Sequence, residues 1–170
     1  MAQSTDLAEP SKYFLQPGYI YLPDTPTVIS TVLGSCVSVC IFDRKRKSGG
    51  MNHFRFPITR EREKATADYG NVATLALINM MTGNGTDPKH LEAQIIGGAY
   101  NPDISSEDIG RKNVWVARKV LVRNRIRIVS EDTGGSRGRK VVFHTLNNEV
   151  GIFKVENLRK GDWAPYASER

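Results

Sequence analysis

The chain reads LGSCVSVCIFD at residues 33–43 and GGMNHF at residues 49–54, and these two segments decide how the rest of the sequence is interpreted. Residues 36–42 of the first segment are apolar almost throughout, which is typical of a strand buried on both faces. A charged tip, DRKRK at residues 43–47, separates the segments and predicts the turn of a hairpin. Such a hairpin brings one cysteine, Cys36, close to one histidine, His53.

The spacing of this pair is compatible with a catalytic dyad. If the turn centres between Arg44 and Lys45, Cys36 lies directly opposite His53, and opposed residues have Cβ atoms about 4.5–5.5 Å apart. A thiol next to an imidazole is an activated nucleophile, and an imidazolium there favours the reactive thiolate. The preceding turn, Gly34-Ser35, can aim backbone N–H groups at a developing oxyanion.

Two further questions follow from the dyad. A catalytic imidazole is normally oriented by a third group, and Ser30, Thr31 and Asn52 are the nearby candidates. A buried cysteine on an apolar strand is more often a small hydrophobic residue than a nucleophile. We interpret Cys40, which has no polar turn before it, in that way.

Composition and charge limit the possible functions. The chain has 170 residues, of which 39% are hydrophobic and 25% charged, which suits one globular domain. The polar residues 1–16 contain no signal-peptide core and no run could cross a bilayer, so we expect a cytoplasmic protein with free thiols. A net charge of +6 favours an acidic partner. We expect neither nucleic-acid binding, because no aromatic residues alternate with the basic ones, nor a metal or other cofactor.

The order of predicted elements indicates a layered fold. Strands are predicted at residues 19–22, 27–33, 36–42, 51–56, 91–99, 125–131, 141–145 and 150–155. Helices are predicted at 71–82, ending at Gly83, and from Ser105 or Ser106 to about Asn124. Strands dominate, which predicts α/β layers with a mixed, largely antiparallel sheet and not a doubly wound fold. We expect one domain over residues 17–157, between a flexible tail at 1–16 and a C-terminal tail at 158–170.

Several segments together resemble one family. The run LGSCVSVCIFD followed by GGMNHFRFP is similar to the signature of CheD, the chemoreceptor glutamine deamidase of bacterial chemotaxis. The resemblance continues in IIGGA at 95–99, IGRKN at 109–113 and EDTGGSRGRKVVF at 131–143, and covers about residues 17–157. It implies a layered α/β sandwich similar to the catalytic domain of cytotoxic necrotizing factor toxins.

The resemblance also implies a reaction and its residues. The family's catalytic cysteine falls on Cys36, its histidine on His53, and its third residue, typically a threonine six positions before the cysteine, on Ser30. Serine keeps the hydroxyl but loses the methyl group that stiffens the rotamer, and Thr31 is the alternative. The implied enzyme is a protein-glutamine glutaminase that converts receptor glutamines to glutamate through a cysteine thioester and releases ammonia. The implied partners are cytoplasmic helices of methyl-accepting chemotaxis receptors and the phosphatase CheC. The alternative is a CheD-like binding module, with weak or lost catalysis, that regulates CheC or the receptors.

Overall fold

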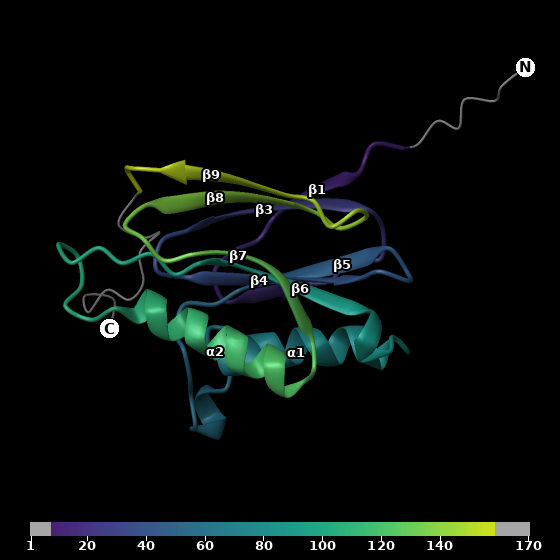
Figure 1. Cartoon of the computed structure of the whole chain (residues 1–170), viewed down its shortest axis with the longest axis horizontal. Coiled ribbons are helices and arrows are strands. Elements are labelled where there is room, and N and C mark those ends of the chain that lie inside the picture. The colour runs from purple at the N-terminus through teal and green to yellow at the C-terminus, as the bar shows by residue number, and fades with distance from the viewer. Residues whose placement is uncertain (1–7, 159–170) are drawn as a thin grey trace, which may run out of the picture.

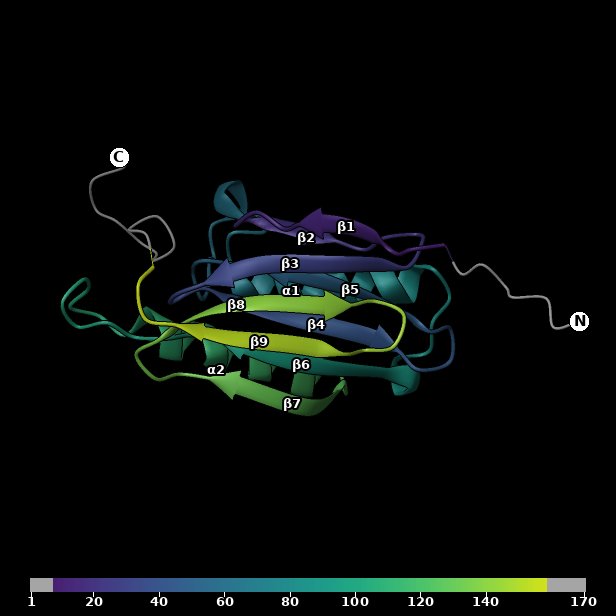
Figure 2. The same cartoon turned by 90° about the horizontal axis from the view of Figure 1, so that it is seen from above.

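A computed structural model describes residues 8–158 of the chain. Three layers are stacked on one another: a four-stranded sheet, a five-stranded sheet, and two helices that cover the outer face of the second sheet (Figures 1 and 2). The predicted layered α/β sandwich is therefore confirmed, with two sheets in place of one. Nearly all of the expected C-terminal tail lies outside the described residues.

Both sheets are mixed and mainly antiparallel. The four-stranded sheet has the order β1 (Ser11–Phe14), β3 (Thr27–Leu33), β8 (Gly138–His144), β9 (Val150–Val155). The five-stranded sheet has the order β2 (Tyr19–Tyr21), β5 (Ser48–His53), β4 (Val37–Asp43), β6 (Leu91–Gly97), β7 (Arg127–Thr133). Only β1–β3 and β6–β7 are parallel pairs among these strands. Consecutive strands β3 and β4 thus belong to different sheets, and the chain crosses between the sheets at residues 34–36.

The first strand corrects one expectation. Residues 1–16 were expected to form a flexible tail, but β1 pairs with β3 along its whole length. The next residue, Leu15, is fully buried between the sheets. The ring of Tyr13 also stacks on that of Tyr21 with centroids 3.9 Å apart. The buried side chain of Leu15 and the stacked ring of Tyr13 explain why the segment is held. The folded domain therefore begins before residue 17.

Two α-helices form the third layer, and the start of the second differs from the expected one. Helix α1 spans Gly70–Gly83 and helix α2 spans Ile109–Arg123, with short 3₁₀ helices at Arg62–Lys64 and Pro88–His90. The expected cap of α2 at Ser105 or Ser106 is wrong, because the side chain of Asp108 accepts the hydrogen bond from the Arg111 N–H. Within the described range, neither helix combines the length and the apolar character needed to span a membrane.

Strand β4 separates two hydrophobic cores. All seven of its residues are buried, as its apolar sequence predicted. Val37, Val39 and Ile41 face the helices, where they pack with residues such as Leu77 of α1. On the alternate face, Cys40 lies in the layer between the two sheets. Cys36, in the turn before β4, lies in that same inter-sheet layer.

Candidate active site

The register of the β4–β5 hairpin differs from the expected one by two residues. Cys40 pairs with Met51, and beyond the ladder Val37 pairs with Phe54. In this register His53 lies opposite position 38, and Cys36 is not its direct partner. Because side chains alternate with a period of two, a shift of two residues leaves Cys36 and His53 on the same face as diagonal neighbours.

The turn explains this difference. The carboxylate of Asp43 accepts hydrogen bonds from the backbone N–H groups of Lys45 and Arg46, at 2.8 and 3.0 Å. The N–H of Lys47 donates to the Asp43 carbonyl at 2.9 Å, and Lys47 adopts a left-handed conformation with φ of 55°. The turn is therefore centred between Lys45 and Arg46, one position later than expected.

Both members of the expected dyad are almost completely buried in the layer between the sheets. Cys36 is 3% exposed and His53 is 1% exposed. Both cysteines are thiols. Complete burial raises the pKa of the Cys40 thiol well above its usual range, which keeps it neutral and confirms its interpretation as a core residue.

The hydroxyl that contacts the imidazole belongs to Thr31 and not to Ser30. Thr31 Oγ1 lies 2.8 Å from His53 Nδ1 and donates its own hydrogen to the carbonyl oxygen of Leu15 at 2.8 Å. A hydroxyl has one hydrogen, so it accepts the bond from Nδ1–H, and the neutral imidazole carries its lone pair on Nε2. Ser30 is the neighbour of Thr31 on β3 and therefore faces the other side of that sheet.

The third candidate, Asn52, faces the helices. Its side-chain oxygen accepts a hydrogen bond from the Val39 N–H at 2.8 Å, and its amide nitrogen lies 3.4 Å from the hydroxyl of Thr74 in α1. The Asn52 side chain therefore replaces one backbone hydrogen bond between β4 and β5 and links the hairpin to α1. Thr31 is thus the one of the three candidates that the structure brings to the imidazole.

Burial determines the protonation state of His53. Loss of solvent, reinforced by the positive charge of Arg55, lowers the pKa of His53 from its ordinary 6.5 to about 3. The resting imidazole is therefore neutral near pH 7, and the imidazolium expected from the sequence is not favoured. Nε2 is buried and has no hydrogen-bond partner among residues 8–158. A base with an available lone pair consequently lies on the face that it shares with Cys36.

The turn that carries Cys36 is fixed through its carbonyl groups. The N–H groups of Ala99 and Gly98 donate to the carbonyls of Gly34 and Cys36 at 3.0 and 2.8 Å. The side-chain amide of Asn113, in α2, donates to the Ser35 carbonyl at 3.0 Å. These three bonds hold the peptide planes on either side of Cys36, as an oxyanion site would require.

Asn113 is a site residue to which the sequence analysis assigned no role. It is fully buried, and the same amide nitrogen also donates to the carbonyl of Arg55 at 3.0 Å. It therefore ties the turn before β4 to the segment after β5. Its position in the sequence could have indicated this role. Asn113 ends the IGRKN segment and lies on the same helix face as the buried residues Val116 and Ala117.

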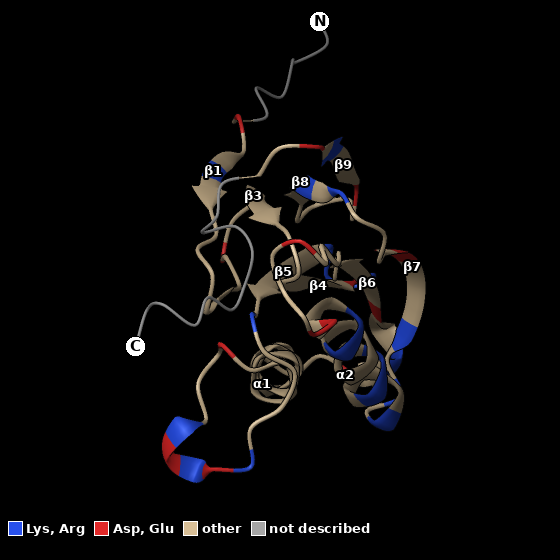
Figure 3. Ribbon diagram, turned by 90° about the vertical axis from the view of Figure 1, so that its left-hand side faces the viewer, with Lys and Arg blue, Asp and Glu red and all other residues tan. Residues whose placement is uncertain are grey.

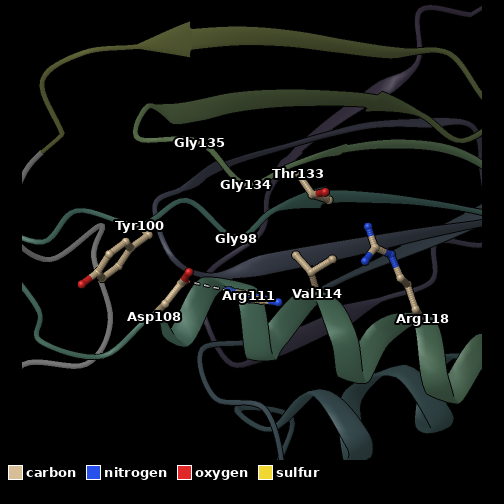
Figure 4. A pocket seen from close by; sticks show the side chains of 9 residues that line it. All are labelled: Gly98, Tyr100, Asp108, Arg111, Val114, Arg118, Thr133, Gly134 and Gly135. Carbon is tan, nitrogen blue, oxygen red and sulfur yellow. Dashed lines mark hydrogen bonds between the residues drawn. The ribbon is translucent and has the colours of Figure 1, made fainter.

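A surface pocket adjoins this turn without containing the dyad. It lies between α2 and the loops that follow β6 and β7, and its lining includes Gly98, Arg111, Arg118 and Gly134 (Figure 4). Gly98 connects it to the site, because the Gly98 N–H holds the Cys36 carbonyl. Within the described part of the chain, no three His, Cys, Asp or Glu side chains are grouped as metal ligands would be.

The fold and site define a class of protein: an α/β sandwich with a cysteine and a neutral, threonine-oriented histidine buried between its sheets. The model of the family described as "CheD chemotactic sensory transduction" matches residues 57–154. A protein of Sulfurimonas denitrificans named probable chemoreceptor glutamine deamidase CheD is 35% identical over 87% of this chain and 97% of its own length. Proteins of the same name from Trichlorobacter lovleyi and Methanococcus vannielii are 39% and 36% identical, over 82% and 84% of this chain and 88% and 94% of their own. The chain belongs to the CheD family.

Proposed function

We propose that the protein is a cytoplasmic protein-glutamine deamidase that acts on methyl-accepting chemotaxis receptors, with Cys36 as nucleophile and His53 as general acid and base. The names of the relatives support the substrate and the reaction. The observation that carries the proposal is the hydrogen bond from His53 Nδ1–H to Thr31, which leaves the Nε2 lone pair on the face shared with Cys36.

The neutral imidazole suits the first step of this reaction. Nε2 of His53 accepts the thiol proton of Cys36, and the thiolate attacks the side-chain amide carbon of a substrate glutamine. The resulting imidazolium gives its proton to the amide nitrogen, the carbon–nitrogen bond breaks, and ammonia leaves. Burial disfavours the charged imidazole, so it favours transfer of this proton to the leaving group and equally opposes formation of the imidazolium from the thiol.

The second half of the reaction repeats the same proton transfers. Nε2 accepts a proton from water, whose oxygen attacks the thioester carbon. The carbon–sulfur bond breaks, glutamate is formed, and the proton returns to the Cys36 sulfur. Throughout, Thr31 acts as a positioning residue because it holds Nδ1–H. The family pattern implied Ser30 for this role. Ser30 faces the other side of the sheet, however, and the contact with His53 supports Thr31.

Mass spectrometry of a receptor cytoplasmic fragment tests the proposal. Incubation with the wild type should release ammonia and add about one mass unit for each modified glutamine, since NH₂ is replaced by OH. Cys36→Ala should abolish both signals because the thioester cannot form. Cys40→Ala is the matched control: it removes the second buried thiol, which lies in β4, and should retain deamidation. Deamidation that persists in Cys36→Ala would overturn the assignment.

The alternative is a binding module that engages receptors or the phosphatase CheC without turnover. The observation that favours it is the burial of both Cys36 and His53 at 3% exposure or less, so that a substrate side chain reaches them only if the surrounding loops move. Tight receptor binding by a wild type that produces no mass change would establish this alternative. We propose CheC as a second partner on the strength of the family resemblance.

A further inference from the structure

The two helices of the outer layer differ sharply in charge. Helix α1 contains no charged residue, whereas α2 contains five basic residues and no acidic one. In Figure 3, α1 is accordingly tan, whereas α2 carries blue segments. Lys112 and Arg118 are neutralised by ion pairs with Glu107 and Glu131. The remaining three, Arg111, Lys119 and Arg123, take part in no ion pair among the described residues.

Between two of these unneutralised cations lies an exposed aromatic ring. Trp115 is 51% exposed, and the Lys119 ammonium lies 4.4 Å from its ring centroid. Arg111 is one helical turn before Trp115 and Lys119 one turn after, so the three side chains form one outward stripe. Tryptophan and arginine are the residues most enriched among those that dominate binding energy at protein interfaces.

The stripe begins next to the turn that carries the nucleophile. Arg111 lines the pocket that reaches Gly98 (Figure 4), and it also lines a second hollow beside Trp115. The Gly98 N–H holds the carbonyl of Cys36, and Asn113 of the same helix holds the carbonyl of Ser35. A partner that lies along α2 is therefore brought to the edge of the catalytic turn.

We propose that the stripe Arg111–Trp115–Lys119 is the docking surface for an acidic α-helix of the protein substrate. The complementary helix carries an apolar side chain that covers Trp115 and carboxylates four residues before and after it, which meet Arg111 and Lys119. This spacing follows from the rise of about 6 Å for four helical residues on both partners. The identity of the partner as a receptor rests on the proposed function, whereas the chemistry of the partner rests on the stripe.

Trp115 itself provides the measurement. The chain has two tryptophans, so Trp163→Phe leaves Trp115 as the single emitter, and Cys36→Ala prevents turnover during the titration. The probe is an alanine-rich helical peptide of about 20 residues with the pattern Glu-x₃-Leu-x₃-Glu. We expect a saturable blue shift of the emission as the ring is buried. The same peptide with glutamine in place of both glutamates should bind about ten-fold more weakly, because two ion pairs are lost.

Charge reversal on the protein supplies the second arm. Arg111→Glu with Lys119→Glu should weaken binding of the acidic peptide at least ten-fold, through lost attraction and new repulsion. Lys12→Glu with Lys140→Glu is the matched control. It makes the same change in net charge at exposed positions of β1 and β8, in the layer opposite the helices, and should leave the affinity unchanged.

Three results would overturn the docking surface: no change in Trp115 emission, equal affinity after reversal on α2, or equal weakening by both reversals. A response to duplex DNA together with none to the peptide would assign the stripe to a different partner and also overturn it. Each of these outcomes leaves the proposed function intact, because the mass change of the receptor fragment is measured separately. Conversely, if the wild type does not deamidate the receptor fragment, the proposed function fails, but the peptide titration still tests the docking surface.

Discussion

The hydroxyl of Thr31 selects the tautomer of the neutral His53 imidazole that carries its proton on Nδ1. Replacing the hydroxyl by an isosteric methyl group, in Thr31→Val, removes two buried hydrogen bonds: the one from Nδ1–H of His53 and the one to the carbonyl of Leu15. We expect kcat/KM for deamidation to fall about 100-fold, as displacement of a catalytic group by about 1 Å does in other enzymes. Ser30→Ala, at the adjacent position facing the other side of the sheet, should stay within a few-fold of the wild type.

Kinetics of the folded protein separate this positioning role from a merely structural one. Thr31→Ser keeps the hydroxyl and should recover most of kcat. If Thr31 only stabilised the fold, Thr31→Val would lower the free energy of unfolding while its folded fraction kept the wild-type kcat. Equal losses in Thr31→Val and Ser30→Ala would also contradict the geometry.

At the residue scale, the sequence predicted that Cys36 and His53 share one face of the hairpin, but it did not predict their neighbours. Cys36 and His53 could be predicted because a Gly-Ser turn and a hairpin are local patterns. The choice between Ser30 and Thr31 depends on which face of β3 looks toward the second sheet, and that depends on pairing with β8, more than 100 residues later. Asn113 could not be found for the same reason, since its partners are the turn before β4 and the segment after β5.

At the scale of elements, α2 is held against the loop that supports the Cys36 turn by a backbone contact that only glycine permits. A Cβ atom on Gly110 would lie 2.4 Å from the carbonyl oxygen of Gly98 and 2.5 Å from that of Ala99. Gly110→Ala should therefore push α2 away from the loop after β6, whose N–H groups fix the carbonyls of Gly34 and Cys36. We expect a loss of about 1–3 kcal/mol in the free energy of unfolding and a clear loss of kcat.

Gly83→Ala is the matched control for this prediction. Gly83 is the last residue of α1, and a Cβ atom there would meet no heavy atom within 4 Å. Alanine favours the helix, so the substitution should leave stability unchanged or raise it by up to about 1 kcal/mol. Denaturant unfolding together with kcat/KM decides the matter, and similar results for the two variants would show that the contact at Gly110 is unimportant.

The elements themselves were predictable where the pattern is local. The predicted strand at 27–33 has the bounds of β3, and the apolar run that forms β4 is buried on both faces as expected. The division into two sheets was not predictable, because it depends on which distant strands pair. That division determines the position of the candidate site: the chain changes sheets at residues 34–36, and Cys36 lies at this crossing.

At the scale of the whole molecule, the layered architecture buries a titratable group in an apolar layer. His53 and Cys36 lie between two sheets, among residues such as Leu33, Met51 and Ile96. The same burial that keeps the imidazole neutral couples its titration to folding, because the unfolded chain exposes the ring to water. Protonation of the His53 imidazole and loss of the folded structure in acid should therefore occur together.

The stability of the protein should accordingly fall in mild acid. The folded-state pKa of His53 is lowered to about 3, against 6.5 in the unfolded chain, so between these values the unfolded state binds the extra proton. The free energy of unfolding therefore decreases as pH falls through this window, by up to about 1.4 kcal/mol per pH unit. His53→Gln removes this titration, and its unfolding free energy should vary less between pH 6.5 and 4 when measured by urea denaturation. Protonation of Asp43 should cause a second loss of stability at lower pH. Burial raises the pKa of Asp43, but hydrogen bonds from Thr86 and from the N–H groups of the turn outweigh burial and hold this pKa below its usual value. Protonating Asp43 therefore weakens these hydrogen bonds and lowers the free energy of unfolding further. Parallel losses of stability in the wild type and His53→Gln over pH 6.5–4 would show that the imidazole is not the group that links acid to unfolding.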